Sequence, residues 1–160
     1  LGEELRALDD SIAVFDARIA QTAREDERIR RLLEVEGIGP ITASALVAKV
    51  GNGTQFNSGR DMAALLGLTP RQYSSGGKNR LGGISKQGDR YLRGLFVAGA
   101  LAVIRYAKIH GTKHRPWLTA LLARRPTKVA AIALANKLAR MVWAMMVKGE
   151  RYKEPVALAR

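Results

Sequence analysis

A heptad seam in the N-terminal part of the chain restricts the possible folds more than any other sequence feature. Seam positions recur at alternating spacings of three and four residues from Leu5 to Leu33, with polar interruptions at Thr22 and Asp26. Neither Gly nor Pro occurs between Leu5 and Glu36. The spacing predicts one helix of about 30 residues that needs a partner, as in a coiled coil or a long antiparallel hairpin. An amphipathic helix lying on its own domain is the alternative.

The remaining sequence predicts a compact helical domain, so the expected fold class is all-α. Apolar segments are separated by Gly and Pro, and the expected helices span residues 41–50, 60–68, 86–109, 115–125 and 128–148. The expected caps and ends of these helices are Ser58 with Asp61, Ser85, Thr127, Gly51 and Gly149. No strand-like alternation stands out, so residues 70–85 are expected to form a loop. The expected organisation is a linker helix at 1–36, a domain at 37–150 and a tail at 151–160.

The positive charge of the chain lies almost entirely behind the first helix. Residues 1–36 contain ten acids and six Lys or Arg, whereas the rest contains four acids and twenty-one Lys or Arg, within a formal net charge of +13. Such a field favours a polyanionic partner, of which nucleic acid is the commonest. The absence of Cys fits a reducing, cytoplasmic setting, and no apolar run is long and uninterrupted enough to predict a membrane span. The chain starts at Leu1 without a signal segment, and we expect it to be part of a longer protein.

The tetrapeptide Gly-Ile-Gly-Pro at 37–40 is the first motif with a chemical meaning. Two glycines allow close backbone approach, and the following helix would direct its N-terminal amides at an anion, as in a helix-hairpin-helix element. The residues expected to contact phosphate here are Gly37, Gly39 and Lys49. A tight interhelical turn without a ligand is the alternative.

The stretch at 70–93 combines glycines with many cations. Its basic residues favour a loop that follows a phosphate backbone, and those expected to bind DNA are Arg71, Lys78, Arg80, Lys86, Arg90 and Arg93. A solvated basic loop is the alternative, and free of DNA the loop is expected to be mobile. Ser74 and Ser75 could attack a phosphodiester, although serine needs a base or a metal to become a strong nucleophile. Beyond residue 37 the four acids and two histidines have no ligand-like spacing, so no metal site is expected in this chain.

Three segments together resemble a known family. They are LLEVEGIGPITASALVAKVG, FNSGRDMAALLGLTPRQYSSGGKNRLGGISKQGDRYLR and KVAAIALANKLARMVWAMM, and their order and spacing resemble the C-terminal transposase domain of the insertion-sequence-110 family. That family includes Piv/MooV-type DNA invertases and bridge-RNA-guided recombinases. The resemblance covers about residues 32–150, and the preceding helix resembles the coiled-coil linker of the family.

The resemblance implies a two-part enzyme that acts in DNA transposition and recombination. An N-terminal RuvC-like domain with a DEDD site would bind Mg²⁺, and the C-terminal domain would supply a serine that attacks DNA. The P-R-x-Y-x-S-G context corresponds to Pro70, Arg71, Tyr73, Ser75 and Gly76, which selects Ser75 as the catalytic nucleophile. The resemblance also implies element and target DNA as partners, a possible guide RNA, and a homo-oligomer formed through the N-terminal helix. Because the DEDD carboxylates are absent, this chain by itself is expected to be an incomplete enzyme.

Two other classes of protein fit the residues. One is a non-catalytic helix-hairpin-helix module that binds DNA or RNA, in which the serines are loop residues. The other is a basic structural or RNA-binding protein whose long helix forms an oligomer.

Overall fold

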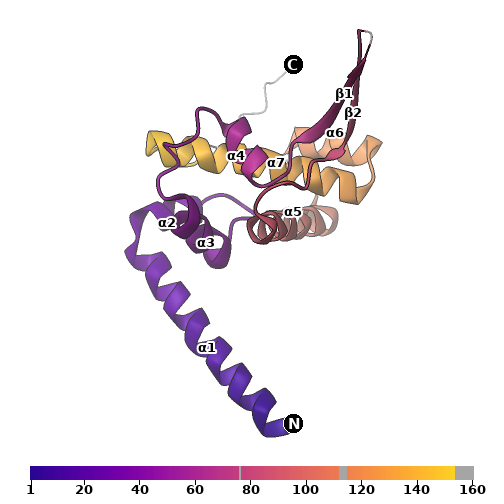
Figure 1. Ribbon diagram of the computed structural model, residues 1–160. Coiled ribbons are helices and arrows are strands. Elements are labelled where there is room, and N and C mark those ends of the chain that lie inside the picture. Colours follow the sequence, from indigo (N-terminus) through magenta and orange to yellow (C-terminus); the bar gives the residue numbers. More distant parts are fainter. Residues whose placement is uncertain (76, 112–114, 154–160) are drawn as a thin grey trace.

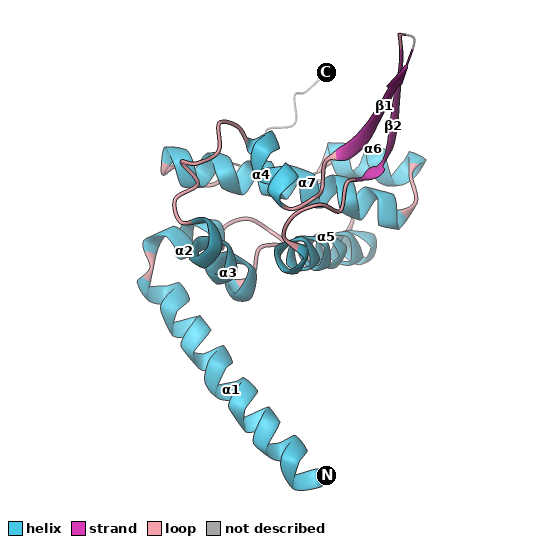
Figure 2. Ribbon diagram, viewed as in Figure 1, coloured by secondary structure: helices cyan, strands magenta, loops and turns pink. Residues whose placement is uncertain are grey.

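The computed structural model describes residues 1–75, 77–111 and 115–153. Its elements are α1 (Gly2–Glu25), α2 (Glu27–Leu32), α3 (Pro40–Val50), α4 (Gly59–Leu65), β1 (Pro70–Ser75), β2 (Lys78–Ile84), α5 (Arg90–His110), α6 (Pro116–Arg124) and α7 (Thr127–Lys148). Helices form a compact body, from which α1 projects on one side and the β1–β2 hairpin on another (Figure 1; Figure 2). The all-α prediction is therefore confirmed in its broad sense, with one small antiparallel sheet added.

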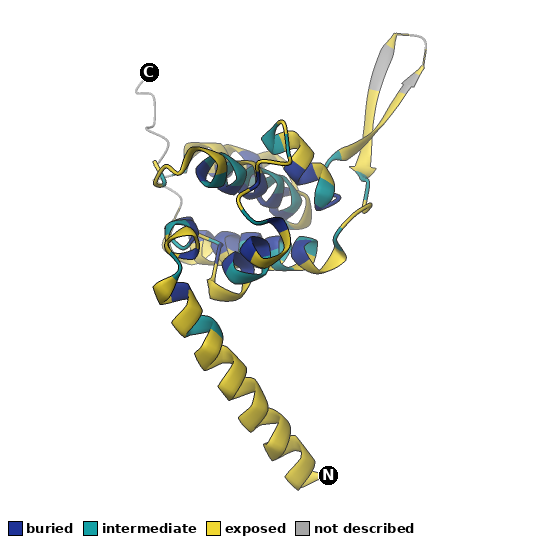
Figure 3. Cartoon of the chain, turned by 60° about the vertical axis from the view of Figure 1, so that its left-hand side comes forward, coloured by how far each residue is buried: buried dark blue, intermediate teal, exposed yellow. Residues whose placement is uncertain are grey.

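The N-terminal helix is not the single helix that the heptad seam predicts. It breaks at Asp26, whose backbone is extended (φ −83°, ψ 113°) and whose Oδ1 accepts a hydrogen bond of 2.8 Å from the N–H of Arg28. Asp is a strong N-cap because its side chain satisfies a free amide of the next helix. The break lets α2 turn onto the body and bury Ile29 and Leu32, whereas residues 2–18 of α1 stay exposed (Figure 3).

Helices α5 and α7 form the centre of the core and are the most extensively packed pair of helices. Their buried faces carry many small side chains, including Ala100, Ala131 and Ala135, which allow close approach of the two backbones. Phe96 and Leu92 of α5 are fully buried among them. Helix α7 is long and apolar enough to span a membrane, but it packs on α4, α5 and α6 as a core helix of the body.

The Gly-Ile-Gly-Pro turn leads into α3 as expected and packs against α5. Gly37 has φ +95°, and a Cβ there would lie 3.0 Å from Val103 Cγ2 and 3.1 Å from Leu138 Cδ1. A Cβ on Gly99 of α5 would lie 1.9 Å from the carbonyl oxygen of Gly37. These two glycines therefore allow the turn to contact the central helices directly.

Residues 70–85 form a β-hairpin, so the prediction of a loop was wrong. Strands β1 and β2 pair antiparallel, with Ser75 opposite Lys78, Tyr73 opposite Arg80 and Pro70 opposite Ile84. The stretch lacks the apolar alternation of a half-buried strand because the hairpin extends away from the body, and the side chains of described burial in its strands are exposed apart from the half-buried Ile84. A Gly-Gly dipeptide between two strand-length segments is a hairpin signal that could have identified it.

Helix boundaries agree with local signals at several positions and differ at two. Ser58 caps α4 and accepts from the N–H of Asp61, while Gly51 and Gly149 end α3 and α7 with positive φ. Ser85 does not cap α5, which begins at Arg90 after the N-cap Asp89, whose carboxylate accepts from the N–H of Leu92. Thr127 is the first residue of α7 and makes no N-cap, because Pro126 occupies that position without a side-chain hydrogen bond.

Candidate nucleic-acid interface

Ser75 lies at the end of β1, near the tip of the hairpin. It is exposed and pairs in the strand register with Lys78. Side chains on alternate residues of a strand share a face, and so do those of directly paired residues. Ser75, Tyr73 and Arg80 therefore occupy one face, and both Tyr73 and Arg80 are exposed. The candidate nucleophile thus shares a face with an aromatic ring and a guanidinium.

The ring of Tyr73 lies against Gly82 of the neighbouring strand β2. A Cβ on Gly82 would lie 2.6 Å from Tyr73 Cε2, so the ring occupies the space that a side chain at 82 would take. Gly83, by contrast, has open space around its Cβ position. Of these two neighbouring glycines, Gly82 is thus the one needed for the position of the Tyr73 ring.

The base of the hairpin is held by close backbone contacts between residues 67–69 and residues 85–87. The backbone N–H of Ser85 donates to Thr69 O (2.8 Å), and that of Lys86 donates to Gly67 O (3.1 Å). A Cβ on Gly67, which has φ +66°, would lie 2.1 Å from the carbonyl oxygen of Gln87. Lys86 is the one described non-glycine residue with positive φ, at +56°. The hairpin therefore emerges from a base that the backbone itself restrains.

Two of the predicted DNA-binding arginines take part in this base. Arg93 donates from Nη1 to the carbonyl oxygens of Leu66 and Lys86, each at 3.2 Å, and Arg71 donates from Nη2 to Ser85 O at 3.2 Å. Arg93 is half-buried, whereas Arg71 is exposed beside the irregularity in strand pairing between Pro70 and Gln72. Arg93 consequently has a structural role that its sequence context did not indicate.

Lys49 is engaged by an acid from a distant part of the sequence. Its Nζ lies 2.5 Å from Asp89 Oδ2 and 5.4 Å from the centre of the Tyr91 ring. The hydrogen bond from Lys49, followed by that from the N–H of Leu92, holds the pKa of the Asp89 carboxyl below its ordinary value. Lys49 thus joins α3 to the start of α5, and its predicted contact with phosphate stays a prediction.

The other predicted contacts are distributed over different parts of the surface. Arg90 is exposed in the first turn of α5, and Arg80 is exposed on β2. Gly39 is the exposed N-cap of α3, with open space at its Cβ position, whereas Gly37 faces the core. Lys78 lies in β2, opposite Ser75 in the register. The structure brings together the hairpin residues and leaves the Gly-Ile-Gly-Pro turn as a separate feature.

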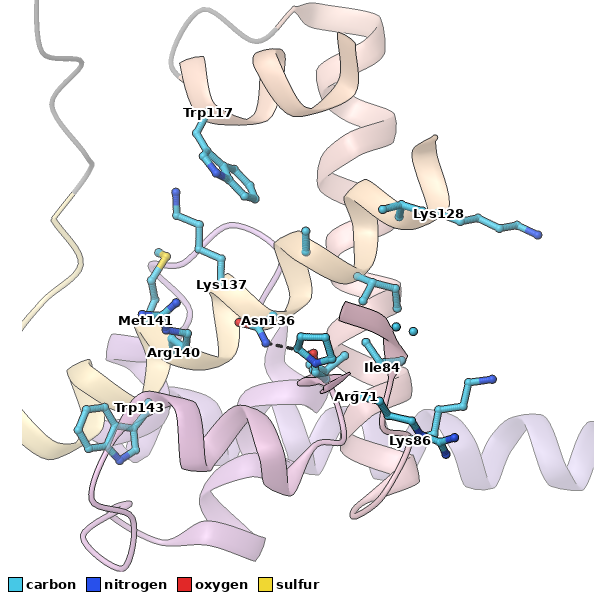
Figure 4. A pocket seen from close by; sticks show the side chains of 18 of the residues that line it. Arg71, Ile84, Lys86, Trp117, Lys128, Asn136, Lys137, Arg140, Met141 and Trp143 are labelled. Atoms are coloured by element: carbon cyan, nitrogen blue, oxygen red, sulfur yellow. Dashed lines mark hydrogen bonds between the residues drawn. The ribbon is translucent and has the colours of Figure 1, made fainter. Parts of the chain in front are cut away.

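Sequence reasoning missed a groove of about 1330 Å³ along the outer side of α7. The hairpin base lies at one side of it and α6 at another (Figure 4). Its basic lining residues are Arg71, Lys86, Lys128, Lys137 and Arg140, and the described lining includes no Asp or Glu. Apolar atoms of Pro70, Ile84 and Met141 line it as well. The spacing of Lys137 and Arg140 on one helix was the available sequence signal, but α6 and the hairpin join them only through folding.

Three aromatic residues line this groove, namely Tyr73, Trp117 and Trp143. Lys137 Nζ is 4.3 Å from the centre of the Trp117 ring, and Figure 4 shows Lys137 of α7 reaching toward Trp117 of α6. Burial lowers the pKa of the Lys137 ammonium, and the nearby Arg115 guanidinium lowers it further. Trp143 donates from Nε1 to Gly53 O at 3.2 Å. Trp117 is 39% exposed, so its ring remains available to a ligand.

Asn136 connects the groove to the hairpin base. Its Nδ2 donates to the carbonyl oxygen of Leu68 at 3.1 Å, immediately before Thr69 and Pro70 of the hairpin. Because Asn136 belongs to α7, this bond helps to set the hairpin at a defined position relative to the helix that lines the groove.

The hairpin itself contains no residue that could act as a carboxylate or imidazole base for Ser75. Its strands, PRQYSS and KNRLGGI, include no Asp, Glu or His. Among the described residues, no three His, Asp or Glu side chains converge as metal ligands, so these residues do not fit a Mg²⁺ site. Activation of Ser75 by a carboxylate, an imidazole or a metal ion would have to come from groups outside the hairpin.

Comparisons with known proteins give a consistent result. A family model described as "Transposase IS116/IS110/IS902 family" matches residues 29–115. The chain is 50% identical over 160 residues to "Probable family 20 transposase" of Pseudomonas aeruginosa, covering 96% of this chain and 47% of that protein. It is 42% identical over 140 residues to "Transposase for insertion sequence element IS1328" of Yersinia enterocolitica, covering 88% and 42%. It is 39% identical over 150 residues to "Transposase for insertion sequence element IS1111A" of Coxiella burnetii, covering 94% and 41%. The chain thus spans less than half the length of each relative.

Proposed function

This chain belongs to the IS116/IS110/IS902 transposase family, and on that premise we propose that it is the DNA-binding, nucleophile-bearing part of a transposase. The observation that carries the proposal is the position of Ser75, exposed at the end of a basic β-hairpin. DNA is the partner that the names of its relatives indicate, since an insertion sequence element moves within DNA. We propose a cytoplasmic setting, where that DNA lies.

The proposed reaction is transfer of a DNA strand through a covalent phosphoserine. Ser75 Oγ attacks the scissile phosphorus and loses its proton to a general base. The bond from phosphorus to a DNA oxygen breaks, and that oxygen takes up a proton and leaves as a DNA hydroxyl. A DNA hydroxyl from a second end then attacks the same phosphorus and releases Ser75. One phosphodiester is exchanged for another, so no oxidant or external energy source is needed.

The residues around Ser75 have separate roles in this proposal. Arg80 lies on the same face and would neutralise charge on the phosphate, while Arg71, Lys86 and Arg90 near the base would position the DNA backbone. Tyr73 would offer a flat surface beside the reacting strand. Arg93 would act indirectly, by holding Lys86 through its carbonyl oxygen.

The rest of the protein would supply what this chain lacks. The Mg²⁺ expected from the family resemblance has no fitting ligand set among the described residues, and we assign it to the part of the protein outside this chain. A guide RNA is a further proposed partner. Helix α1 exposes Leu5, Leu8, Ile12 and Phe15 at 57–59%, and we propose that this seam pairs with a second copy of the protein.

The experiment uses the full-length protein that contains this chain, with element DNA, Mg²⁺ and any guide RNA. A denaturing gel would detect a covalent protein–DNA adduct in the wild type, Ser75→Ala and the matched control Ser74→Ala. The expected result is an adduct lost in Ser75→Ala, retained in Ser74→Ala, and mapped by peptide mass to Ser75. An adduct that survives in Ser75→Ala would overturn the assignment.

A second candidate function follows from the absence of Asp, Glu and His in the strands of the hairpin. The chain could be a non-catalytic helix-hairpin-helix module that binds DNA or RNA, with Gly39 as the phosphate contact at the start of α3. DNA cleavage by wild type without any adduct, and unchanged in Ser75→Ala, would favour this function, because water would then be the nucleophile.

A further inference from the structure

We propose that the groove along α7 binds an unpaired, single-stranded segment of the DNA strand that continues along the hairpin. The inference rests on the proposed function for its ligand, but it assigns a second site, on α7 and α6, that shares Arg71 and Lys86 with the proposed contacts at the hairpin base. The groove is defined by Arg71 and Lys86 at the hairpin base, Lys128, Lys137 and Arg140 on α7, and Trp117 on α6.

The charge of the groove selects a polyanion. Five Lys or Arg side chains line it, and no Asp or Glu does so among its described lining residues. Lys128 and Arg140 are exposed and lie twelve positions apart on α7, about 18 Å at the rise of an α-helix. Cations distributed over such a length fit successive phosphates of a strand better than a single small anion.

The apolar surface of the groove distinguishes a single strand from a duplex. Phosphates of a duplex would use the cations but leave the apolar part bare, because paired bases expose only their edges in the grooves. Unpaired bases expose flat faces that stack on aromatic side chains. The Trp117 ring is partly exposed and has the Lys137 ammonium over its face, and Met141 lines the same groove. Lys137 can therefore contact a phosphate while Trp117 stacks on the adjacent base.

The position of the groove connects it to the reaction. Arg71 and Lys86 border it and also lie where the hairpin leaves the body, and β1 runs from Pro70 to Ser75 over about 17 Å. Asn136 of the groove is hydrogen-bonded to the hairpin base through Leu68 O. A strand held on α7 would thus continue along the hairpin toward the proposed nucleophile.

The test measures binding of this chain to a fluorescent oligo(dT) and to a duplex of equal length by anisotropy. Trp117→Ala is expected to weaken oligo(dT) binding about tenfold and duplex binding less than twofold. Lys137→Ala should make the log–log salt slope for oligo(dT) shallower by about 0.7. Arg105→Ala removes the same charge from an exposed position on α5 outside the groove, and it should leave single-strand selectivity and the effect of Trp117→Ala unchanged.

Trp117→Phe provides a variant that keeps an aromatic surface and the packing of α6. It should retain most of the affinity for oligo(dT), and unfolding curves of all variants would identify any that fail to fold. Loss of oligo(dT) binding in Trp117→Ala, with retention in Trp117→Phe, supports stacking. Equal loss for single strand and duplex, or no loss for either, would overturn the proposal.

Two competing ligands, oligo(U) and poly-glutamate, test whether the groove prefers RNA or any polyanion over single-stranded DNA. Oligo(U) that binds more tightly than oligo(dT) would identify RNA as the ligand, and poly-glutamate that competes as well as oligo(dT) would show attraction by charge alone. Either result rejects this inference. The adduct experiment on Ser75 tests a separate proposal. An adduct at Ser75 together with unselective groove binding would refute only the proposal for the groove. Selective groove binding together with an adduct that survives Ser75→Ala would refute only the assignment of Ser75 as the nucleophile.

Discussion

The carbonyl oxygen of Gly37 lies 1.9 Å from the position that a Cβ on Gly99 would occupy. This approach joins the Gly-Ile-Gly-Pro turn to the central helix α5. The presence of glycine at position 37 is therefore explained by packing in a tight turn between helices, without a phosphate ligand.

Gly99→Ala is expected to destabilise the protein by about 1–3 kcal/mol, since the new methyl group must displace backbone rather than a flexible side chain. Urea denaturation would measure the free energy of unfolding. Gly94→Ala on the same helix is the matched control, because its Cβ position has open space. It should stabilise α5 by up to about 1 kcal/mol through helix propensity. Equal effects of the two substitutions would contradict the packing account.

Asp89 should contribute stability that depends on pH. Asp89→Ala removes the N-cap of α5 and the partner of Lys49, and it is expected to cost about 1–2 kcal/mol at pH 7. Because the folded-state pKa lies below the ordinary value of 3.8, the ionic part of this contribution is complete above that pH. It is lost as the pH falls through the lower folded-state pKa. Asp89→Asn keeps a capping oxygen without the titration, so its difference from wild type should shrink over the same acidic range.

The Tyr73 ring should move when Gly82 acquires a side chain. Gly82→Ala would place a methyl group 2.6 Å from the present position of Cε2, and the ring can rotate away at little cost in global stability. We expect the unfolding free energy to change by less than about 0.5 kcal/mol while the covalent adduct forms more slowly. The control is Gly83→Ala, with open space at its Cβ position. The rate of adduct formation would be measured for both variants in the full-length protein. Equal rates in Gly82→Ala and Gly83→Ala would show that the position of the Tyr73 ring does not affect the reaction.

Self-association through α1 should respond to a charge in its seam. Ile12→Glu places a carboxylate at a position that is 57% exposed in one chain and that would be buried between two. Sedimentation equilibrium is expected to show smaller species, because the dissociation constant for self-association rises at least tenfold. Arg6→Glu, outside the seam on the same helix, is the control. A chain that is monomeric at all concentrations, or an oligomer that Ile12→Glu leaves intact, would exclude pairing through this seam.

Local chemistry explains which parts of the fold could be predicted. Ser58, Gly51 and Gly149 act on their own backbone neighbours, so their roles followed from short sequence patterns. The heptad seam predicted a long helix correctly up to Glu25 but not the break at Asp26, because a capping aspartate resembles any polar interruption of a seam. The hairpin was missed because its strands pair through backbone hydrogen bonds, which most residue types can form, and show no apolar alternation.

The sequence by itself determined the helical class, the basic character behind residue 36 and the resemblance that selects Ser75, since each depends on residue types and short spacings. Only the tertiary structure decided which cations share a surface. Lys49 is paired with Asp89 and Arg93 with backbone carbonyls, whereas Trp117, Lys137 and Arg71 meet in one groove from three different elements. The physical reason is that contacts between distant segments depend on how the helices pack, and that packing is a property of the whole core.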